Sequence, residues 1–268
     1  MKAASRYPMA QARLFSPFWE SRVVYGESVA LEKSGPEKPA DGTLLFTPAK
    51  VLRVRSSDGA TEYREGVDFT VDAAGRRLVL MPGSAIPFID HAALYKRKGD
   101  PQSIGRKIDD PETYLFYAER WFPRVQVEVD YERAEDWAGY APAFAGADLS
   151  RTVAKLKRGE GLRLCVTGDS ISTGANASKT VPPYMPPYVT LLQKGLEQAY
   201  GGEIAVANLA VPGATAKGGV DKIHLVVAEK PDLVVIAFGM NDTAGHHADH
   251  YQAQLKAVIA GVRAALPD

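Results

Sequence analysis

Residues 162–172 read LRLCVTGDSIS, a short apolar run that ends in a glycine and a group of small polar residues. Two similar apolar runs follow, IAVANL at residues 204–209 and LVVIAF at residues 233–238. The segments between them carry apolar residues at helical spacing, for example Val189 and Leu192. Strands buried on both faces give continuous apolar runs, and helices connect such strands in α/β folds. We therefore predict three parallel strands with helices on both sides of the sheet.

A polar cluster stands at the end of each predicted strand. These clusters are residues 168–172, 208–213 and 239–242. In α/β sheets, ligands bind in the crevice at the carboxyl ends of the parallel strands. A serine hydroxyl in that crevice can attack a carbonyl carbon, while backbone N–H groups and an Asn amide stabilise the oxyanion that forms. The pattern therefore predicts a site for acyl transfer.

The three clusters read GDSIS, NLAVPG and GMND, and in this order they resemble the first three sequence blocks of the SGNH (GDSL-type) serine ester hydrolases. The resemblance spans residues 160–242. It implies that Ser170 is the nucleophile, and that Ser170 N–H, Gly213 N–H and the Asn241 side-chain amide form the oxyanion hole. It also implies a flavodoxin-like three-layer α/β fold. The alternative is that Gly-Asp-Ser is a turn in which Ser170 only caps the next segment.

The fourth block of the family, in which an Asp precedes a catalytic His by three residues, does not follow the third block here. The one match to that spacing, Asp221 to His224, lies between the second and third blocks in a predicted helix, and we interpret it as coincidence. We expect a chain truncated after its third strand and the following helix, without the catalytic His and Asp. A partner chain that supplies them is the alternative. In either case this chain alone should be weak or inactive.

Three histidines, His246, His247 and His250, follow the Asn241 loop and offer a local substitute for that base. The simpler interpretation is a solvated helix N-terminus. The same histidines lie near Asp242 and Asp249, but they match no familiar metal-ligand pattern, and a structural zinc usually has four ligands. We therefore expect neither a metal nor another cofactor.

The first half of the chain has a different pattern, in which apolar and polar residues alternate. Val127, Val129 and Tyr131 alternate with acidic residues, which predicts a strand with one wet face. Turn signals at Asp58-Gly59 and at residues 72–75 predict two hairpins. We expect a jelly-roll-like β-sandwich. The predicted organisation is therefore an N-terminal extension at 1–19, the β-sandwich at 20–135, a linker with a short helix at 136–160, and the SGNH hydrolase domain at 161–268.

Composition limits the classes of partner. Lysine plus arginine number 32 and aspartate plus glutamate number 32, so the formal net charge is zero and there is no global basic field for nucleic acid or an anionic membrane. The sequence shows neither a signal peptide nor an apolar run long enough to span a membrane, so we expect a cytoplasmic protein unless a leader was removed. Cys165 is the only cysteine, and its apolar surroundings predict a buried, inert thiol.

The function that these patterns favour is ester hydrolysis through an acyl-enzyme, with a small-molecule or carbohydrate ester as substrate. Deacetylation of a carbohydrate is the first expectation for the substrate class, by analogy with SGNH enzymes that carry an accessory β-sandwich. The alternative, from another functional class, is a non-catalytic protein whose β module binds a glycan or a partner and whose hydrolase domain is a remnant.

Overall fold

The computed structural model describes residues 17–105, 114–116, 122–175, 186–243 and 247–266. The chain divides into two compact units, Met1–Ala141 and Pro142–Asp268. The division falls within residues 136–160, for which we propose a linker. None of the helices that the structure describes has the length and apolar character needed to cross a bilayer.

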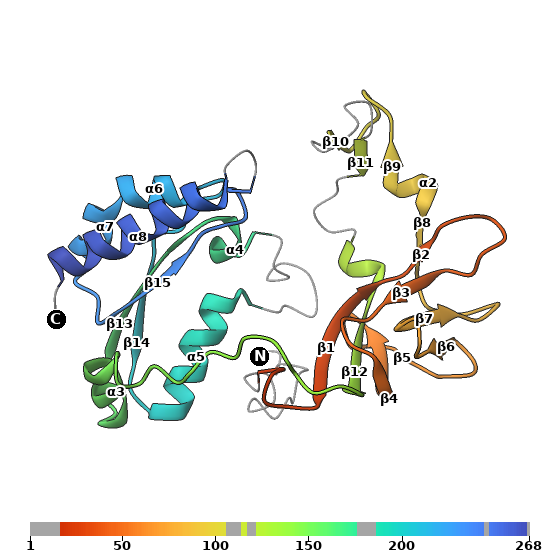
Figure 1. The fold of residues 1–268 in the computed structure, drawn as a ribbon, viewed down its shortest axis with the longest axis horizontal. Helices are drawn as coiled ribbons and strands as arrows, with labels where there is room; N and C mark the ends of the chain where they lie inside the picture. Colours follow the sequence, from red (N-terminus) through yellow and green to blue (C-terminus); the bar gives the residue numbers. More distant parts are fainter. Residues whose placement is uncertain (1–16, 106–113, 117–121, 176–185, 244–246, 267–268) are drawn as a thin grey trace, which may run out of the picture. The chain divides into compact units, whose positions relative to one another are not determined.

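The first unit is built from β-sheets whose strands pair mostly antiparallel, although β2 and β8 pair in parallel (Figure 1). Within its described residues, one sheet has four strands in the order β1-β12-β4-β5, with the bounds β1 Val23–Ala30, β4 Pro48–Ser56, β5 Glu62–Tyr63 and β12 Gln126–Arg133. A second sheet has five strands in the order β6-β7-β3-β2-β8, with the bounds β2 Glu32–Lys33, β3 Asp41–Thr43, β6 Phe69–Asp72, β7 Arg77–Leu80 and β8 Ile89–Asp90. Side chains of both sheets form one buried core, which includes Val54, Val129 and Tyr131 from the first and Phe69 and Leu78 from the second. This shared core confirms the predicted β-sandwich.

Both predicted hairpins are present. Strands β4 and β5 pair antiparallel around the Asp58-Gly59 turn, and β6 and β7 pair antiparallel around residues 73–76. The sequence pattern missed a small third sheet in the order β10-β11-β9, and two short helical segments. Their bounds are β9 Tyr95–Lys96, β10 Ser103–Gly105, β11 Tyr114–Phe116, α2 His91–Leu94 and the 3-10 segment η1 Phe122–Arg124.

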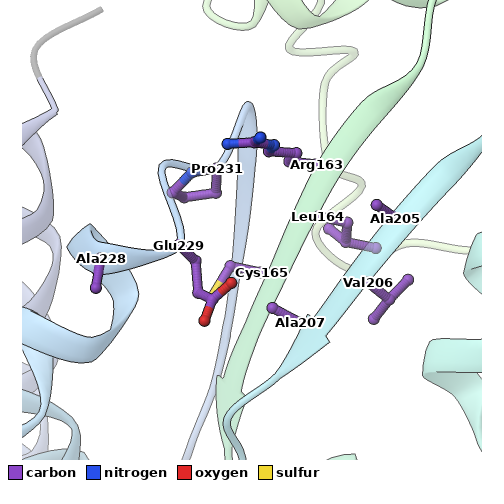
Figure 2. Close-up of a pocket in the computed structure, with 9 residues that line it drawn as sticks. All are labelled: Arg163, Leu164, Cys165, Ala205, Val206, Ala207, Ala228, Glu229 and Pro231. Carbon is purple, nitrogen blue, oxygen red and sulfur yellow. The ribbon is translucent and has the colours of Figure 1, made fainter.

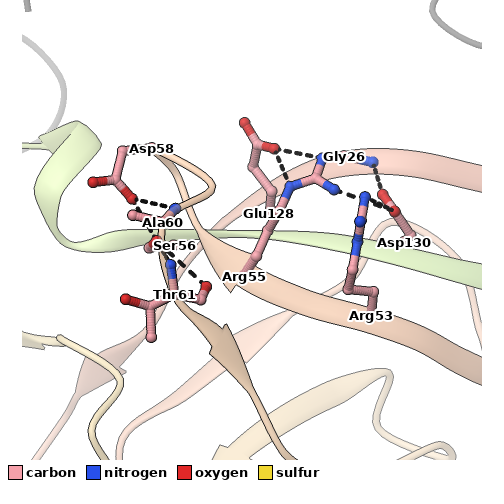
Figure 3. A network of polar contacts seen from close by, with 9 residues as sticks. All are labelled: Gly26, Arg53, Arg55, Ser56, Asp58, Ala60, Thr61, Glu128 and Asp130. Atoms are coloured by element: carbon pink, nitrogen blue, oxygen red, sulfur yellow. Dashed lines mark hydrogen bonds and ion pairs between the residues drawn. The ribbon is translucent and has the colours of Figure 1, made fainter. Parts of the chain in front are cut away.

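The wet face predicted for strand β12 is wrong at Asp130, whose side chain is buried. Figure 3 shows the cause, a network of charges across strands β1, β4 and β12. The Asp130 carboxylate accepts from Gly26 N–H at 2.7 Å and from Arg53 at 3.0 Å, and it pairs with Arg55 at 3.4 Å. Arg55 also pairs with Glu128 at 2.7 Å. Burial raises the pKa of Glu128, although the hydrogen bonds from Arg55 act in the opposite direction. Acidic residues can thus be buried here because arginines on the next strand pair with them.

The second unit contains the predicted parallel sheet, in the order β14-β13-β15 among its described residues. The bounds of its elements are α3 Ser150–Lys157, β13 Leu162–Gly168, α4 Ser170–Thr173, α5 Tyr188–Tyr200, β14 Ile204–Asn208, α6 Ala216–Asp221, α7 Ile223–Ala228, β15 Leu233–Ala237 and α8 Ala248–Ala265. Helices α3 and α5 cover one face of the sheet, and α6, α7 and α8 cover the other (Figure 1). This is the three-layer α/β arrangement that the apolar runs predicted.

The alternation of side chains along β13 explains the two layers of core. Leu162, Leu164 and Val166 pack with α3 and α5, whereas Cys165 packs with α7 and α8. Cys165 is fully buried, as predicted, and burial together with the charge of Glu229 raises the pKa of its thiol to about 11. Cys165 and Glu229 belong to the lining of a pocket of about 360 Å³. The other lining residues come from β13, from β14, and from the end of α7 and the segment that follows it (Figure 2).

Asp232 joins helix α3 to the strands. Its carboxylate accepts from both the Lys155 ammonium at 2.9 Å and Arg163 N–H at 2.7 Å, and its carbonyl accepts from the Thr152 hydroxyl at 2.8 Å. Burial alone would raise the pKa of Asp232, but the hydrogen bonds from Arg163 and Lys155 lower it below its ordinary value. The ionised carboxylate therefore stabilises this end of the sheet.

We expect Asp232→Ala to lower the opening free energy of the β13 amides by about 1 to 2 kcal/mol at neutral pH. The pKa of Asp232 is lower in the folded than in the unfolded state. The stabilisation by its carboxylate is therefore present in full above the unfolded-state pKa of about 3.9, and it is lost as the pH falls through the folded-state pKa. Native-state hydrogen exchange of β13 at both ends of this range measures it. The exposed Lys157→Ala on the same helix is the control. If wild type and Asp232→Ala differ in opening free energy by the same amount in acid as at neutral pH, this account is contradicted.

Candidate active site

The three motif loops leave the sheet at the same edge. Strand β13 pairs in parallel with β14, with Val166 opposite Asn208, and with β15, with Gly168 opposite Ala237. The carboxyl ends of all three strands therefore lie side by side. Backbone hydrogen bonds continue past the strand ends, from Leu209 N–H to Val166 O at 2.8 Å and from Val211 N–H to Gly168 O at 3.0 Å.

Ser170 is the first residue of the one-turn helix α4, directly after β13. The preceding residue, Asp169, is buried and caps this turn, since its carboxylate accepts from Ile171 N–H at 2.9 Å. A side chain at Gly168 would place its Cβ 2.5 Å from the Ala237 carbonyl oxygen and 2.6 Å from the Ser172 hydroxyl. Only glycine allows so close an approach of the turn to the neighbouring strand. Asp169 therefore has a structural role in holding the Ser170 turn.

Helix α4 is also held from two other elements. Asn208, at the end of β14, donates its side-chain N–H to Ser172 O at 2.7 Å, and the hydroxyls of Ser172 and Tyr188 are 2.8 Å apart. The Ser170 side chain is half-buried, and its hydroxyl has no hydrogen-bond partner within the part of the chain that the structure describes. The turn around Ser170 is thus fixed while its hydroxyl points to no described acceptor.

Gly213 lies in the second loop, exposed, with φ at +78°. This left-handed backbone conformation suits glycine, because a Cβ would strain it. Val211, two residues earlier, is the residue whose N–H bonds to Gly168 O. The loop that carries Gly213 is therefore anchored to the end of the strand that leads to Ser170.

Asn241 lies in the third loop, four residues after strand β15 ends, and contacts the second loop. Its side-chain nitrogen donates to Ala214 O at 2.9 Å. The next residue, Asp242, is buried and accepts from Ala216 N–H at 3.0 and 3.1 Å. Hydrogen bonds therefore join the first loop to the second and the second to the third, which brings the loops of Ser170, Gly213 and Asn241 together at one edge of the sheet.

The described histidines of this unit lie in or next to helices α7 and α8. His224 is exposed in α7, and Asp221, in α6, pairs instead with Lys217. His247 precedes α8 and His250 lies in its first turn, both exposed, and His246 falls outside the described residues. In the described ranges, no group of three or more His, Cys, Asp or Glu side chains could hold a metal ion.

Each motif loop also exposes one large apolar side chain. Ile171, Val211 and Met240 are 51%, 39% and 61% exposed. Scattered apolar residues on a surface are normal, but here one stands in each of the three loops that meet at the sheet edge. The edge therefore combines polar backbone donors with apolar side chains, as sites for small organic molecules usually do.

A family model described as the GDSL-like Lipase/Acylhydrolase family matches residues 166–268. This segment is a GDSL-type, or SGNH, hydrolase domain. The match begins within β13 and contains all three motif loops. No curated protein sequence matches the chain significantly.

Several solved structures resemble part of this chain. TesA is 34% identical over 38% of this chain and 55% of its own, with a TM-score of 0.33. The psychrotrophic esterase EstA from Pseudoalteromonas sp. is 24% identical over 38% of this chain and 54% of its own, with a TM-score of 0.32. A two-domain esterase (CEX) active on acetylated mannans is 22% identical over 43% of this chain and 30% of its own, with a TM-score of 0.38. The chain spans about half the length of TesA and EstA.

Two residues of the GDSL-type domain were missed as positioning candidates in the sequence, Asn208 and Asp242. Both lie inside the motifs NLAVPG and GMND. Their hydrogen-bond partners, Ser172 and Ala216, are far away in the sequence, so no local spacing rule points to the contact. A useful signal would have been that each is a polar residue of a motif that stands at the end of a predicted apolar strand.

Proposed function

We propose that the GDSL-type domain hydrolyses esters with Ser170 as nucleophile. Ser170 Oγ attacks the ester carbonyl, the alcohol leaves, and water then hydrolyses the acyl-enzyme. The observation that carries this proposal is the set of hydrogen bonds that joins the loops of Ser170, Gly213 and Asn241 at one sheet edge. Acyl transfer needs a nucleophile and several oxyanion donors in one place, and loops fixed to one another can provide that arrangement.

The proposed oxyanion donors are Ser170 N–H, Gly213 N–H and the Asn241 side-chain amide. Asn241 supports this role through its contact with Ala214 O. An amide nitrogen carries two hydrogens, so one N–H fixes the orientation of the side chain while the other is left for a substrate oxyanion. A donor held in place before the reaction begins needs no reorganisation when the charge develops.

The proton of the Ser170 hydroxyl needs an acceptor. No Asp and His at the family's spacing follow Asn241 in this sequence. We propose that the chain alone is a slow catalyst for this reason, since a serine at neutral pH is a weak nucleophile without a general base. His247 or His250 as the base is the competing possibility, and fast Ser170-dependent turnover by the 268-residue chain would favour it.

For the substrate we propose a carbohydrate ester, with the acyl group removed from a sugar hydroxyl. This proposal rests on the β-sandwich unit that precedes the GDSL-type domain, and on analogy between such two-part chains. Acetate release from O-acetylated oligosaccharides tests it, with p-nitrophenyl acetate as the generic ester. The assay is run on the chain and on the same chain carrying any residues that its gene encodes beyond Asp268.

We expect Ser170-dependent release of acetate from at least one acetylated oligosaccharide, with kcat/KM above that for p-nitrophenyl acetate. If p-nitrophenyl acetate is hydrolysed but no acetate is released from any oligosaccharide, the proposed substrate class is wrong. The proposal that the domain is an esterase then still stands. If neither ester is cleaved in a Ser170-dependent way, the esterase proposal itself fails, and a non-catalytic binding role takes its place.

A further inference from the structure

Asp242 is a buried carboxylate that lies beside the proposed oxyanion donors. Its side chain is on the third motif loop, yet both of its oxygens accept from one N–H on the second loop, that of Ala216, at 3.0 and 3.1 Å. The residue is 3% exposed. Burial of this hydrogen-bonded group limits competition from water.

Ordinary helix capping does not explain this contact. Ala216 begins helix α6, but the cap residue is Thr215, whose hydroxyl already accepts from Gly218 N–H. Asp242 reaches the same turn from 26 residues further along the chain. The contact is therefore a tertiary hydrogen bond between the third and second motif loops.

The hydrogen bond of Asp242 and that of Asn241 reach the same short segment, residues 214–216. Asn241 donates to Ala214 O, and Asp242 accepts from Ala216 N–H. Two adjacent side chains of the third loop are therefore hydrogen-bonded to residues 214–216. Gly213 directly precedes that segment. The two hydrogen bonds therefore link the loop of Asn241 to the residues that directly follow Gly213.

We propose that Asp242 is a positioning residue that fixes the Asn241 amide and Gly213 N–H relative to each other. The inference rests on the proposed function, since it assigns both groups to the oxyanion hole. A displacement of about 1 Å in such a site can lower a rate by about a hundredfold. Among the described residues, the hydrogen bonds of this carboxylate come from the Ala216 N–H.

Three variants separate positioning from general stability or charge. Asp242→Ala removes the acceptor. Asp242→Asn keeps one oxygen in the same place, which is enough because both carboxylate oxygens accept from a single N–H. Asp221→Ala is the matched control, because Asp221 is an exposed carboxylate on the same helix α6.

In steady-state hydrolysis of p-nitrophenyl acetate, we expect Asp242→Ala to lower kcat by about 10- to 100-fold, with KM changed by less than about threefold. Asp242→Asn and Asp221→Ala should stay within about threefold of wild type. A folded Asp242→Ala variant with wild-type kcat would overturn the inference. An equal loss of kcat in Asp242→Asn and Asp242→Ala would also overturn the inference, because positioning requires only the oxygen that Asn retains.

A second measurement does not depend on activity. The Asn241 side-chain N–H that bonds to Ala214 O should exchange slowly with solvent in wild type and in Asp242→Asn, and quickly in Asp242→Ala, as seen by NMR of the 268-residue chain. Unchanged protection in Asp242→Ala would overturn the inference. If protection is lost as expected while wild type shows no Ser170-dependent turnover, the positioning of Asn241 is supported and the proposed function is what fails.

Discussion

Replacing Ser170 with alanine is expected to reduce hydrolysis of p-nitrophenyl acetate to the uncatalysed background. Ser170 is the first residue of α4, and its turn is fixed by the Asp169 cap and by the Asn208 and Tyr188 contacts to Ser172. Alanine fits that turn without new contacts, so the fold should be unchanged. What is lost is the oxygen that we propose forms the acyl-enzyme.

The measurement compares wild type, Ser170→Ala and the control Ser150→Ala, in the 268-residue chain and in the chain extended by any residues encoded beyond Asp268. Ser150 is an exposed serine at the start of α3, so its loss should leave the rate unchanged. The extended chain matters because removing one member of a catalytic group costs little when another member is already absent. Turnover that survives in Ser170→Ala would assign the activity to another residue.

Asn241→Ala is expected to lower kcat by about 10²- to 10³-fold in whichever form of the chain is most active. One N–H of the Asn241 amide bonds to Ala214 O, and we propose that the other donates to the oxyanion. The loss should appear in kcat more than in KM, because the charge that the amide stabilises exists only in the transition state. This is a larger effect than we expect for Asp242→Ala, which displaces the donor without removing it.

The control for Asn241 is Thr243→Ala on the same loop. Thr243 is exposed, and its hydroxyl donates to Met240 O, so the variant tests loop disturbance without removing an oxyanion donor. We expect it to retain most of the activity. Equal losses in Asn241→Ala and Thr243→Ala would contradict a specific role for the Asn241 amide.

The parallel sheet was predictable because its signal is local. LRLCV, IAVAN and LVVIA are apolar runs that need both faces covered, and the structure shows them paired in register. The β-sandwich was predictable in outline for a related reason, since alternation along residues 126–133 identifies the inward side chains Val127, Val129 and Tyr131. The hairpins followed from their turn residues.

What the sequence did not reveal depends on contacts between distant residues. Asp130 looked solvated because its partners Arg53 and Arg55 are more than 70 residues away, across the sheet. The strands β9 and β10 are two and three residues long, too short for a clear alternation. The proposed site residues Ser170, Gly213 and Asn241 were chosen through motifs, whereas the hydrogen bonds made by Asn208 and Asp242 became visible only in the fold.

The most direct test of the central claim is covalent labelling with a fluorophosphonate probe, followed by mass spectrometry of the intact protein and its peptides. The account predicts a single adduct on the peptide that contains Ser170, absent from Ser170→Ala and unchanged in Ser150→Ala, and formed faster in any extended chain that supplies a general base. An adduct on a different residue, or none in either the 268-residue chain or its extended form, would contradict it.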